Sequence, residues 1–296
     1  MIADSHCHAW QNWPYSRTVS DAESRGSAEA LLQEMDLNGV ARAVVVCARI
    51  GGGAGGAGFP NEENNEYVAK FAQKYPDRLQ AWIDVDCVWR PEYHTSNAAQ
   101  RLKNSVHKFG AQGVTHYVAA ENDGWFRSDA GREFFQTAAE LKIVLSLAVY
   151  PNWLEDLRSI ALSNPTLPIL IHHMGLPKNS GSGPDERDVL EIIETSKVPN
   201  IGVKVSGFHY INSDKHNFPY PESQNLFERI FKAFGPRRLF WGSDFPASRD
   251  FFSYSQALEV VQEHSTFLKD HEMNRILGEN LVELLKNPYL PDGTFV

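Results

Sequence analysis

Short apolar, β-branched runs alternate with longer stretches of helical spacing along the chain, and this alternation is the feature that most constrains the fold. The runs are apolar at nearly every position, as the strands of a parallel sheet buried on both faces must be. Eight strands are predicted, at residues 2–4, 41–47, 79–85, 113–118, 143–149, 168–172, 201–205 and 238–241.

Amphipathic segments with recognisable ends lie between the predicted strands. Ser27 can cap a helix that carries Leu31, Leu32 and Met35, and Asn38-Gly39 can end it. Seven more helices are predicted, at residues 65–75, 98–109, 131–141, 153–162, 185–196, 224–234 and 254–268. Eight strand–helix units in 296 residues favour an α/β fold, a (β/α)₈ TIM barrel, with residues 1–296 forming one domain. A doubly wound sheet is the alternative, because alternation alone does not prove that the sheet closes.

Composition limits the partners. The formal net charge is −9, which argues against nucleic acid and anionic membranes as partners and favours a small-molecule substrate.

The three cysteines, Cys7, Cys47 and Cys87, form no CxxC pair, so we expect reduced thiols. We find no basic leader with an apolar core and no run of 18 apolar residues, and therefore predict a cytoplasmic protein.

Three groups of polar residues stand at the ends of predicted strands. His6 and His8 follow the first strand, and residues two apart on a strand point the same way. His172 and His173 end the sixth strand, and Asp244 ends the eighth. In a barrel the carboxyl ends of all strands meet at one face. The sequence therefore predicts that imidazoles and one carboxylate converge at that face.

The sequence resembles the amidohydrolase superfamily, in particular the amidohydrolase-2 branch that contains pyrone-dicarboxylate lactonases, sugar lactonases and decarboxylases. The resemblance is carried by four motifs: Asp4-Ser-His-Cys-His8, His173-Met-Gly175 with Pro177, Val203-Lys-Val-Ser-Gly207 and Trp241-Gly-Ser-Asp-Phe-Pro246. It implies a barrel enzyme in which His6, His8, His173 and Asp244 are the catalytic residues.

Two departures from the family pattern leave the question of a metal open. His172 stands where sugar-lactone relatives usually have Asp, and the fifth strand offers Ser146 where metal-dependent members have a histidine. One alternative is a single divalent ion, zinc by preference, held by His6, His8 and Asp244 with His173 as a further ligand. The other is metal-free catalysis, as in pyrone-dicarboxylate lactonases.

The leading hypothesis for function is hydrolysis of a lactone or related cyclic ester of an organic acid. Asp244 would activate the attacking water, and the histidines would stabilise the oxyanion. One alternative is a metal-dependent, non-oxidative decarboxylase of an aromatic or unsaturated acid. The other is a barrel that binds a ligand without turning it over.

Further residues near strand ends are predicted to bind substrate. Arginines there can hold carboxylates through paired hydrogen bonds, and aromatic side chains can form apolar walls. The predicted substrate-binding residues are Arg49, Arg90, Arg249, His116, Tyr117 and Tyr150, with Trp10 and Trp89 as additional walls.

Three other features carry weaker expectations. Lys204, in an apolar strand, is predicted to pair with a carboxylate inside the barrel such as Asp84. His209, after the seventh strand, is a second-tier candidate for the site. The glycine-rich stretch 51–58 is predicted to be an active-site loop rather than a phosphate cradle, because it lacks a GK[ST] ending. A homodimer is possible for barrels of this branch.

Overall fold

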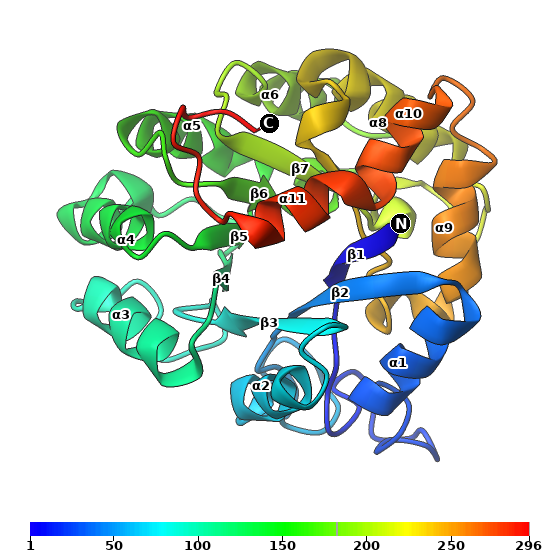
Figure 1. Cartoon of the computed structure of the whole chain (residues 1–296), viewed down its shortest axis with the longest axis horizontal. Helices are drawn as coiled ribbons and strands as arrows, with labels where there is room; N and C mark the ends of the chain where they lie inside the picture. The colour runs from blue at the N-terminus through cyan, green and yellow to red at the C-terminus, as the bar shows by residue number, and fades with distance from the viewer. Residues whose placement is uncertain (182, 296) are drawn as a thin grey trace.

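A computed structural model describes residues 1–181 and 183–295, and in it eight parallel strands are hydrogen-bonded in chain order. The strands lie in the middle of the molecule with helices around them (Figure 1). Their bounds are β1 (Ile2–Cys7), β2 (Val40–Val46), β3 (Leu79–Asp84), β4 (Gly113–Tyr117), β5 (Val144–Ala148), β6 (Ile169–Ile171), β7 (Ile201–Val205) and β8 (Leu239–Trp241). The predicted TIM barrel is confirmed. The sequential strand order excludes the doubly wound alternative, in which the order reverses within the sheet.

Helices follow the strands as predicted, with differences near the C-terminus. The principal helices are α1 (Ala28–Leu37), α2 (Asn64–Lys74), α3 (Ala98–Phe109), α4 (Asp129–Glu140), α5 (Leu154–Ser163), α6 (Glu186–Thr195), α8 (Pro221–Phe234) and α9 (Tyr254–Gln262). The shorter ones are α7 (Phe208–Ile211), α10 (Asp270–Asn274), a π-helical turn (Arg275–Glu279) and α11 (Asn280–Lys286). The Ser27 hydroxyl caps α1 by accepting from the Ala30 amide, as expected.

The predicted helix over residues 254–268 is too long, because α9 ends at Gln262. The reason lies in Ser265, whose hydroxyl hydrogen-bonds to the Val260 carbonyl and to the side chain of Gln224. A side-chain hydroxyl that bonds to nearby backbone competes with the helical pattern. Helices α7, α10 and α11 were not predicted at all.

The wall closes between β8 and β1, where residues far apart in sequence meet. The amide of Asp244 donates to the His6 carbonyl at 2.8 Å, and the amide of His8 donates to the Phe245 carbonyl at 2.6 Å. Beneath them the buried carboxylate of Asp4 accepts from the backbone and hydroxyl of Ser243 and from the hydroxyl of Tyr254. Asp4 therefore ties the first strand to the loop after the last one.

The strands are packed on both faces by apolar side chains, which form one layer outside the barrel and one inside it. The outer layer packs the helices on the wall. The inner layer joins inward-facing strand residues such as Ala3, Trp82 and Phe240 to Leu281 and Leu284 of α11. Because α11 covers the end where the strands begin, the opposite end is left to polar groups. None of the helices within the described residues is long and apolar enough to cross a membrane.

The Asp4 cluster generates a prediction about stability. In Tyr254→Phe the buried Asp4 carboxylate loses one charge-assisted hydrogen bond, so the free energy of unfolding should fall by about 1–3 kcal/mol. Denaturant unfolding measures this. The half-buried Tyr289, after α11, offers Tyr289→Phe as the matched control. Equal stability of the two variants would contradict the role given to Asp4.

Candidate active site

His6 and His8 lie at the carboxyl end of β1 and point to the same side, as the spacing predicts. Nδ1 of His8 lies 2.6 Å from the carbonyl oxygen of Val46 on β2. A carbonyl only accepts, so in neutral His8 the proton is on Nδ1 and Nε2 has a free lone pair. That Nε2 lies 3.5 Å from Oδ1 of Asp244. The neighbouring strand thus fixes which nitrogen of His8 faces the site.

Asp244 follows β8, and its carboxylate lies among the rings of His6, His8 and His173. Its carboxylate is buried, and neither oxygen has a hydrogen-bond partner among the described residues. Oδ1 lies 3.6 Å from Nε2 of His6 and 3.9 Å from Nε2 of His173. The backbone of Asp244 is in the left-handed region, with φ of 57°, and that of His173 is too, with φ of 46°. Such strained backbone is concentrated at functional sites in proteins.

Gly242 allows this arrangement. A Cβ at this position would lie 2.6 Å from Cβ of His6 and 3.0 Å from the His6 amide nitrogen. The close approach of two backbone segments therefore requires a residue without a side chain.

His173 and His172 are held by hydroxyl groups of neighbouring strands. Nδ1 of His173 lies 2.9 Å from Oγ of Ser206, and Nε2 of His172 lies 2.6 Å from Oγ of Ser146. The rings of His6 and His172 are 4.4 Å apart between centroids. The fifth strand lacks a histidine, but His172 fills the space beside Ser146 with an imidazole from the sixth.

Burial sets the charge states of these groups. It lowers the pKa of His173 to about 4 and, together with the charge of Lys204, holds the pKa values of His6 and His172 well below their usual range. Burial also tends to raise the pKa of Asp244, but the facing rings of His173 and His8 outweigh it, so that this pKa lies below its usual value. The imidazoles of His6, His172 and His173 are therefore neutral, and they lie close to an ionised carboxylate.

Lys204 lies beneath these groups, inside the barrel. Its Nζ is 3.3 Å from Nδ1 of His6 and 4.8 Å from the centre of the Trp82 ring. Burial lowers the pKa of Lys204 to about 7. The predicted pairing with Asp84 is wrong, because Asp84 accepts from Arg49 and from the indole nitrogen of Trp89 instead.

A cavity of about 190 Å³ opens onto Asp244 at the carboxyl end of the strands. Its walls are mainly aromatic and small apolar side chains. The described lining consists of His8, Trp10, Tyr15, Ala48, Ile50, Gly55, Trp89, Tyr117, His173, Tyr210, Asp244 and Ala247. Gly55 places the glycine-rich loop at the cavity, as predicted. Tyr15 and Tyr210 were missed, because Tyr15 lies in an irregular segment and Tyr210 in the four-residue helix α7, which is too short to show a period.

Most of the predicted substrate-binding residues lie elsewhere. Tyr117 lines the cavity. Arg49 pairs with Asp84, Arg90 pairs with Glu62, and Arg249 donates to the carbonyl of Arg25.

The other two members of this set, His116 and Tyr150, do not line the cavity either. Nδ1 of His116 lies 3.1 Å from the Val85 carbonyl oxygen, and its Nε2 lies 3.2 Å from Nε2 of His94. Tyr150 lines a second hollow of about 580 Å³, which shares Tyr210 with the first. His209, the second-tier candidate, is buried beside Phe251, and its ring nitrogens have no hydrogen-bond partner within the described residues.

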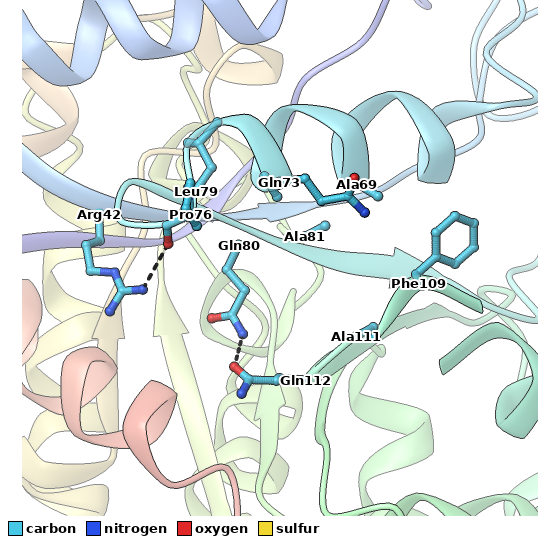
Figure 2. Close-up of a pocket in the computed structure, with 12 residues that line it drawn as sticks. Arg42, Ala69, Gln73, Pro76, Leu79, Gln80, Ala81, Phe109, Ala111 and Gln112 are labelled. Atoms are coloured by element: carbon cyan, nitrogen blue, oxygen red, sulfur yellow. Dashed lines mark hydrogen bonds between the residues drawn. The ribbon is translucent and has the colours of Figure 1, made fainter. Parts of the chain in front are cut away.

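Another pocket, of about 310 Å³, lies at the opposite end, near the starts of β3 and β4 (Figure 2). Its walls include Phe109 and Leu79, with Gln80 hydrogen-bonded to Gln112 across it. Arg42 is the sole charged residue in its described lining, and its guanidinium donates to the Pro76 carbonyl. This pocket has no acid or imidazole in that lining and therefore lacks the groups for proton transfer.

The donor atoms at Asp244 fit a divalent cation in number and spacing. His6, His8 and Asp244 each place one donor atom within 4.8 Å of the others, and His6, His172 and His173 form a second such group. Nε2 of His6 and both oxygens of Asp244 are buried without a hydrogen-bond partner in the described part of the chain. Three converging donors of this kind match a catalytic zinc site with an open position.

A TIM barrel with two histidines on β1, a histidine after β6 and an aspartate after β8 has the architecture of a hydrolase that works at the carboxyl end of its strands. The amidohydrolase family profile (Amidohydro_2) matches residues 3–286, and the chain belongs to this family. It is therefore a hydrolase, as predicted.

The individual proteins to which the chain is similar are distant from it in sequence. An L-fucono-1,5-lactonase from Burkholderia ambifaria is 24% identical over 258 residues, which are 83% of this chain and 80% of that protein. A probable 2-pyrone-4,6-dicarboxylic acid hydrolase from Acinetobacter baumannii, with citric acid bound, superimposes with a TM-score of 0.74 at 22% identity, covering 96% of this chain and 99% of that one. An amidohydrolase from Burkholderia multivorans with bound zinc superimposes with a TM-score of 0.70 at 17% identity. The match covers 97% of this chain and 100% of that one. The two solved structures confirm the fold.

The contact at Gly242 generates a second prediction. Gly242→Ala forces a methyl group against the backbone of His6, which cannot move aside, and overpacking of this kind costs about 1–3 kcal/mol. Denaturant unfolding should show that loss, and the histidine resonances of the variant should shift. A variant as stable as the parent would mean that the two segments are not held as closely as described.

Proposed function

We propose that this hydrolase opens an uncharged lactone or related cyclic ester by direct attack of water. The observation that carries the proposal is the carboxylate of Asp244, which is buried, ionised and free of hydrogen-bond partners among the described residues, with three imidazoles within 3.9 Å of Oδ1. A carboxylate in this state can accept a proton. The name of the L-fucono-1,5-lactonase relative supports a lactone as substrate.

Asp244 removes a proton from water while the water oxygen bonds to the lactone carbonyl carbon. The tetrahedral intermediate collapses when the ring C–O bond breaks. Asp244 then gives its proton to the ring oxygen that leaves, so that water and lactone become one hydroxy acid. The carboxylate ends each cycle in its starting state.

The histidines stabilise the negative charge that develops on the carbonyl oxygen. His6, His8 and His173 surround the carboxylate, and the last two line the cavity, where a substrate carbonyl would lie against them. A neutral ring stabilises an oxyanion only where it presents an N–H, so His8, whose Nε2 has a lone pair in the neutral ring, can contribute only through a bound ion. When a divalent ion is bound by His6, His8 and Asp244, it supplies polarisation of the carbonyl group and charge stabilisation. Zinc suits these nitrogen and oxygen donors.

The lining of the cavity supports an uncharged substrate. Asp244 is the one acidic residue in its described lining, and neither arginine nor lysine is included there. Arg49 and Arg90 are held by acidic partners outside it. A buried substrate carboxylate would thus lack a counter-charge, at a cost of several kcal/mol. Aromatic walls such as Trp10 and Trp89 suit the C–H faces of a sugar ring.

A decarboxylase of an aromatic or unsaturated acid is the second candidate, and the convergence of His6, His8 and Asp244 on a possible metal position favours it. Its substrate is itself a carboxylic acid, so a bound ion would have to provide the counter-charge. Release of carbon dioxide instead of ring opening would identify this activity. A barrel without catalysis would show neither.

The role of Asp244 predicts the effect of removing its charge. Asp244→Asn should keep the fold and lower kcat by about 10²–10⁴-fold or more, because an amide cannot accept the proton. Lactone hydrolysis, followed with a pH indicator, measures the rate, and circular dichroism checks the fold. Asp250→Asn, at an exposed acid paired with Arg25 after the same strand, is the control and should retain activity. Near-normal turnover by the Asp244 variant would remove Asp244 from the mechanism.

The charge of the cavity predicts substrate selection. An uncharged sugar lactone should be hydrolysed with a kcat/KM at least about 100-fold above that of a dicarboxylate lactone of similar size, which corresponds to the cost of burying an unpaired carboxylate. A panel assayed both with zinc and with a chelator measures the ratio. Preference for the dicarboxylate would contradict the uncharged-substrate proposal while leaving lactone hydrolysis intact.

A further inference from the structure

The hollow of about 580 Å³ beside Tyr150 has no part in the reaction described so far, yet it adjoins the catalytic group. Its lining comes from the segments that follow β4, β5 and β6 and from α7, which follows β7. In TIM barrels the loops after the strands build the substrate site. Tyr210 lines this hollow and the cavity at Asp244, and its ring centroid is 5.1 Å from that of His173.

The size of the cavity at Asp244 suggests that it holds only part of a substrate. It has about 190 Å³, whereas pockets for whole small-molecule ligands usually have about 300–1,000 Å³. A space of this size suits a single small ring. The hollow next to it has about 580 Å³ and so has room for a second unit attached to that ring.

The wall of the hollow is held in place by bonds between its loops. The side-chain amide of Asn152 donates to the carbonyl of Ala120 at 2.9 Å, and that of Asn122 donates to the carbonyl of Asn152 at 3.0 Å. Asn122 also donates to the carboxylate of Asp156 on α5. A wall fixed in this way loses little conformational entropy when a ligand binds.

Two side chains of opposite charge remain available in the lining. The carboxylate of Glu121 and the ammonium of Lys178 have no hydrogen-bond or ion-pair partner in the described part of the chain. The backbone of Lys178 is fixed, since its amide donates to Asp188 and its carbonyl accepts from the Asp185 amide. One acid and one base together favour neither an anion nor a cation. A hydroxyl group both donates and accepts, so a polyhydroxylated ligand can bind to both side chains.

The hollow also has an apolar part, formed by Tyr150, Leu176, Pro177 and Tyr210. Tyr210 retains 36% of its accessible surface, which is unusual for a large aromatic side chain beside an active site. Gly207 lets it lie there, because a Cβ at this position would be 2.7 Å from Cδ2 of Tyr210. Sugar rings have apolar C–H faces and hydroxyl groups at their edges. Aromatic surface next to unpartnered polar groups matches both features.

We propose that this hollow is a second sugar subsite and that the substrate is a lactone carrying a glycosyl unit, the lactone of a disaccharide acid. The lactone ring lies in the cavity at Asp244, and the second sugar lies in the hollow, with the glycosidic link beside Tyr210. The placement of the lactone ring rests on the function proposed above. The sugar subsite itself rests on the hollow and its side chains.

Binding without turnover tests the subsite. A 1,5-anhydroalditol keeps the sugar ring but lacks the carbonyl group, so it cannot be hydrolysed. Isothermal titration calorimetry on the full chain compares 1,5-anhydroglucitol with the anhydroalditols of cellobiose, maltose and lactose, which add a second sugar to the same ring. At least one disaccharide derivative should bind about tenfold or more tightly than the monosaccharide. Failure of all three to exceed it would overturn the proposal.

Variants locate the second sugar. Lys178→Met and Glu121→Gln should each reduce the affinity advantage of the disaccharide derivative by at least about threefold, since each removes a charge-assisted hydrogen bond. Lys103→Met on α3 and Glu133→Gln on α4 change exposed charges on the outside of the barrel and are the matched controls. An advantage that survives in both Lys178→Met and Glu121→Gln would mean that the second sugar does not bind in the hollow.

The charge of the second unit is tested in the same way. A derivative with glucuronic acid as the second sugar should bind no more tightly than its neutral counterpart, because Glu121 offsets the attraction of Lys178. Tighter binding of the acid would contradict a neutral ligand in the hollow.

Hydrolysis of the corresponding lactones separates this proposal from the proposed function. If the anhydroalditols show the advantage but no lactone is opened, the sugar subsite stands and lactone hydrolysis is wrong. If monosaccharide lactones are opened but no disaccharide derivative binds more tightly, lactone hydrolysis stands and the subsite is wrong.

Discussion

The closure of the barrel between β8 and β1 is the constraint on which the site depends. Asp244 donates its amide to the carbonyl of His6, and His8 donates its amide to the carbonyl of Phe245. These bonds join chain segments more than 230 residues apart and at the same time place an acid against two imidazoles. Because the backbone groups that close the wall and the side chains that converge belong to the same residues, closure of the wall also brings His6, His8 and Asp244 together.

The sequence was sufficient to predict the barrel and the convergence of four polar residues at one end of it, because both follow from the local pattern that marks where strands begin and end. His6 and His8 are two apart on a strand, and His173 and Asp244 stand where apolar strands end. The direction of a long side chain is decided instead by partners brought in from other segments. Arg49 turns to Asp84, and Lys204 turns to His6, choices that no local pattern reveals. Helices α10 and α11, which follow α9, were missed for a similar reason, since α11 takes its place by covering the inner layer of the barrel.

The charges of the site are arranged along the barrel axis. A lysine lies deepest, neutral imidazoles lie above it, and an ionised carboxylate faces the cavity. On the neighbouring strand, the Val46 carbonyl determines which nitrogen of His8 is the donor. Residues that touch no substrate therefore decide the chemistry of those that do.

Tyr210 stands between the cavity at Asp244 and the larger hollow beside Tyr150, and its side chain lines both. Tyr210 is the one residue that the described linings of the two spaces, of about 190 Å³ and about 580 Å³, have in common. Exchange of this ring for a small residue would enlarge both spaces at the point where their linings meet, next to Asp244. Lineages descended from such a chain can acquire bulkier substrates through one substitution, while the inherited reaction stays the same.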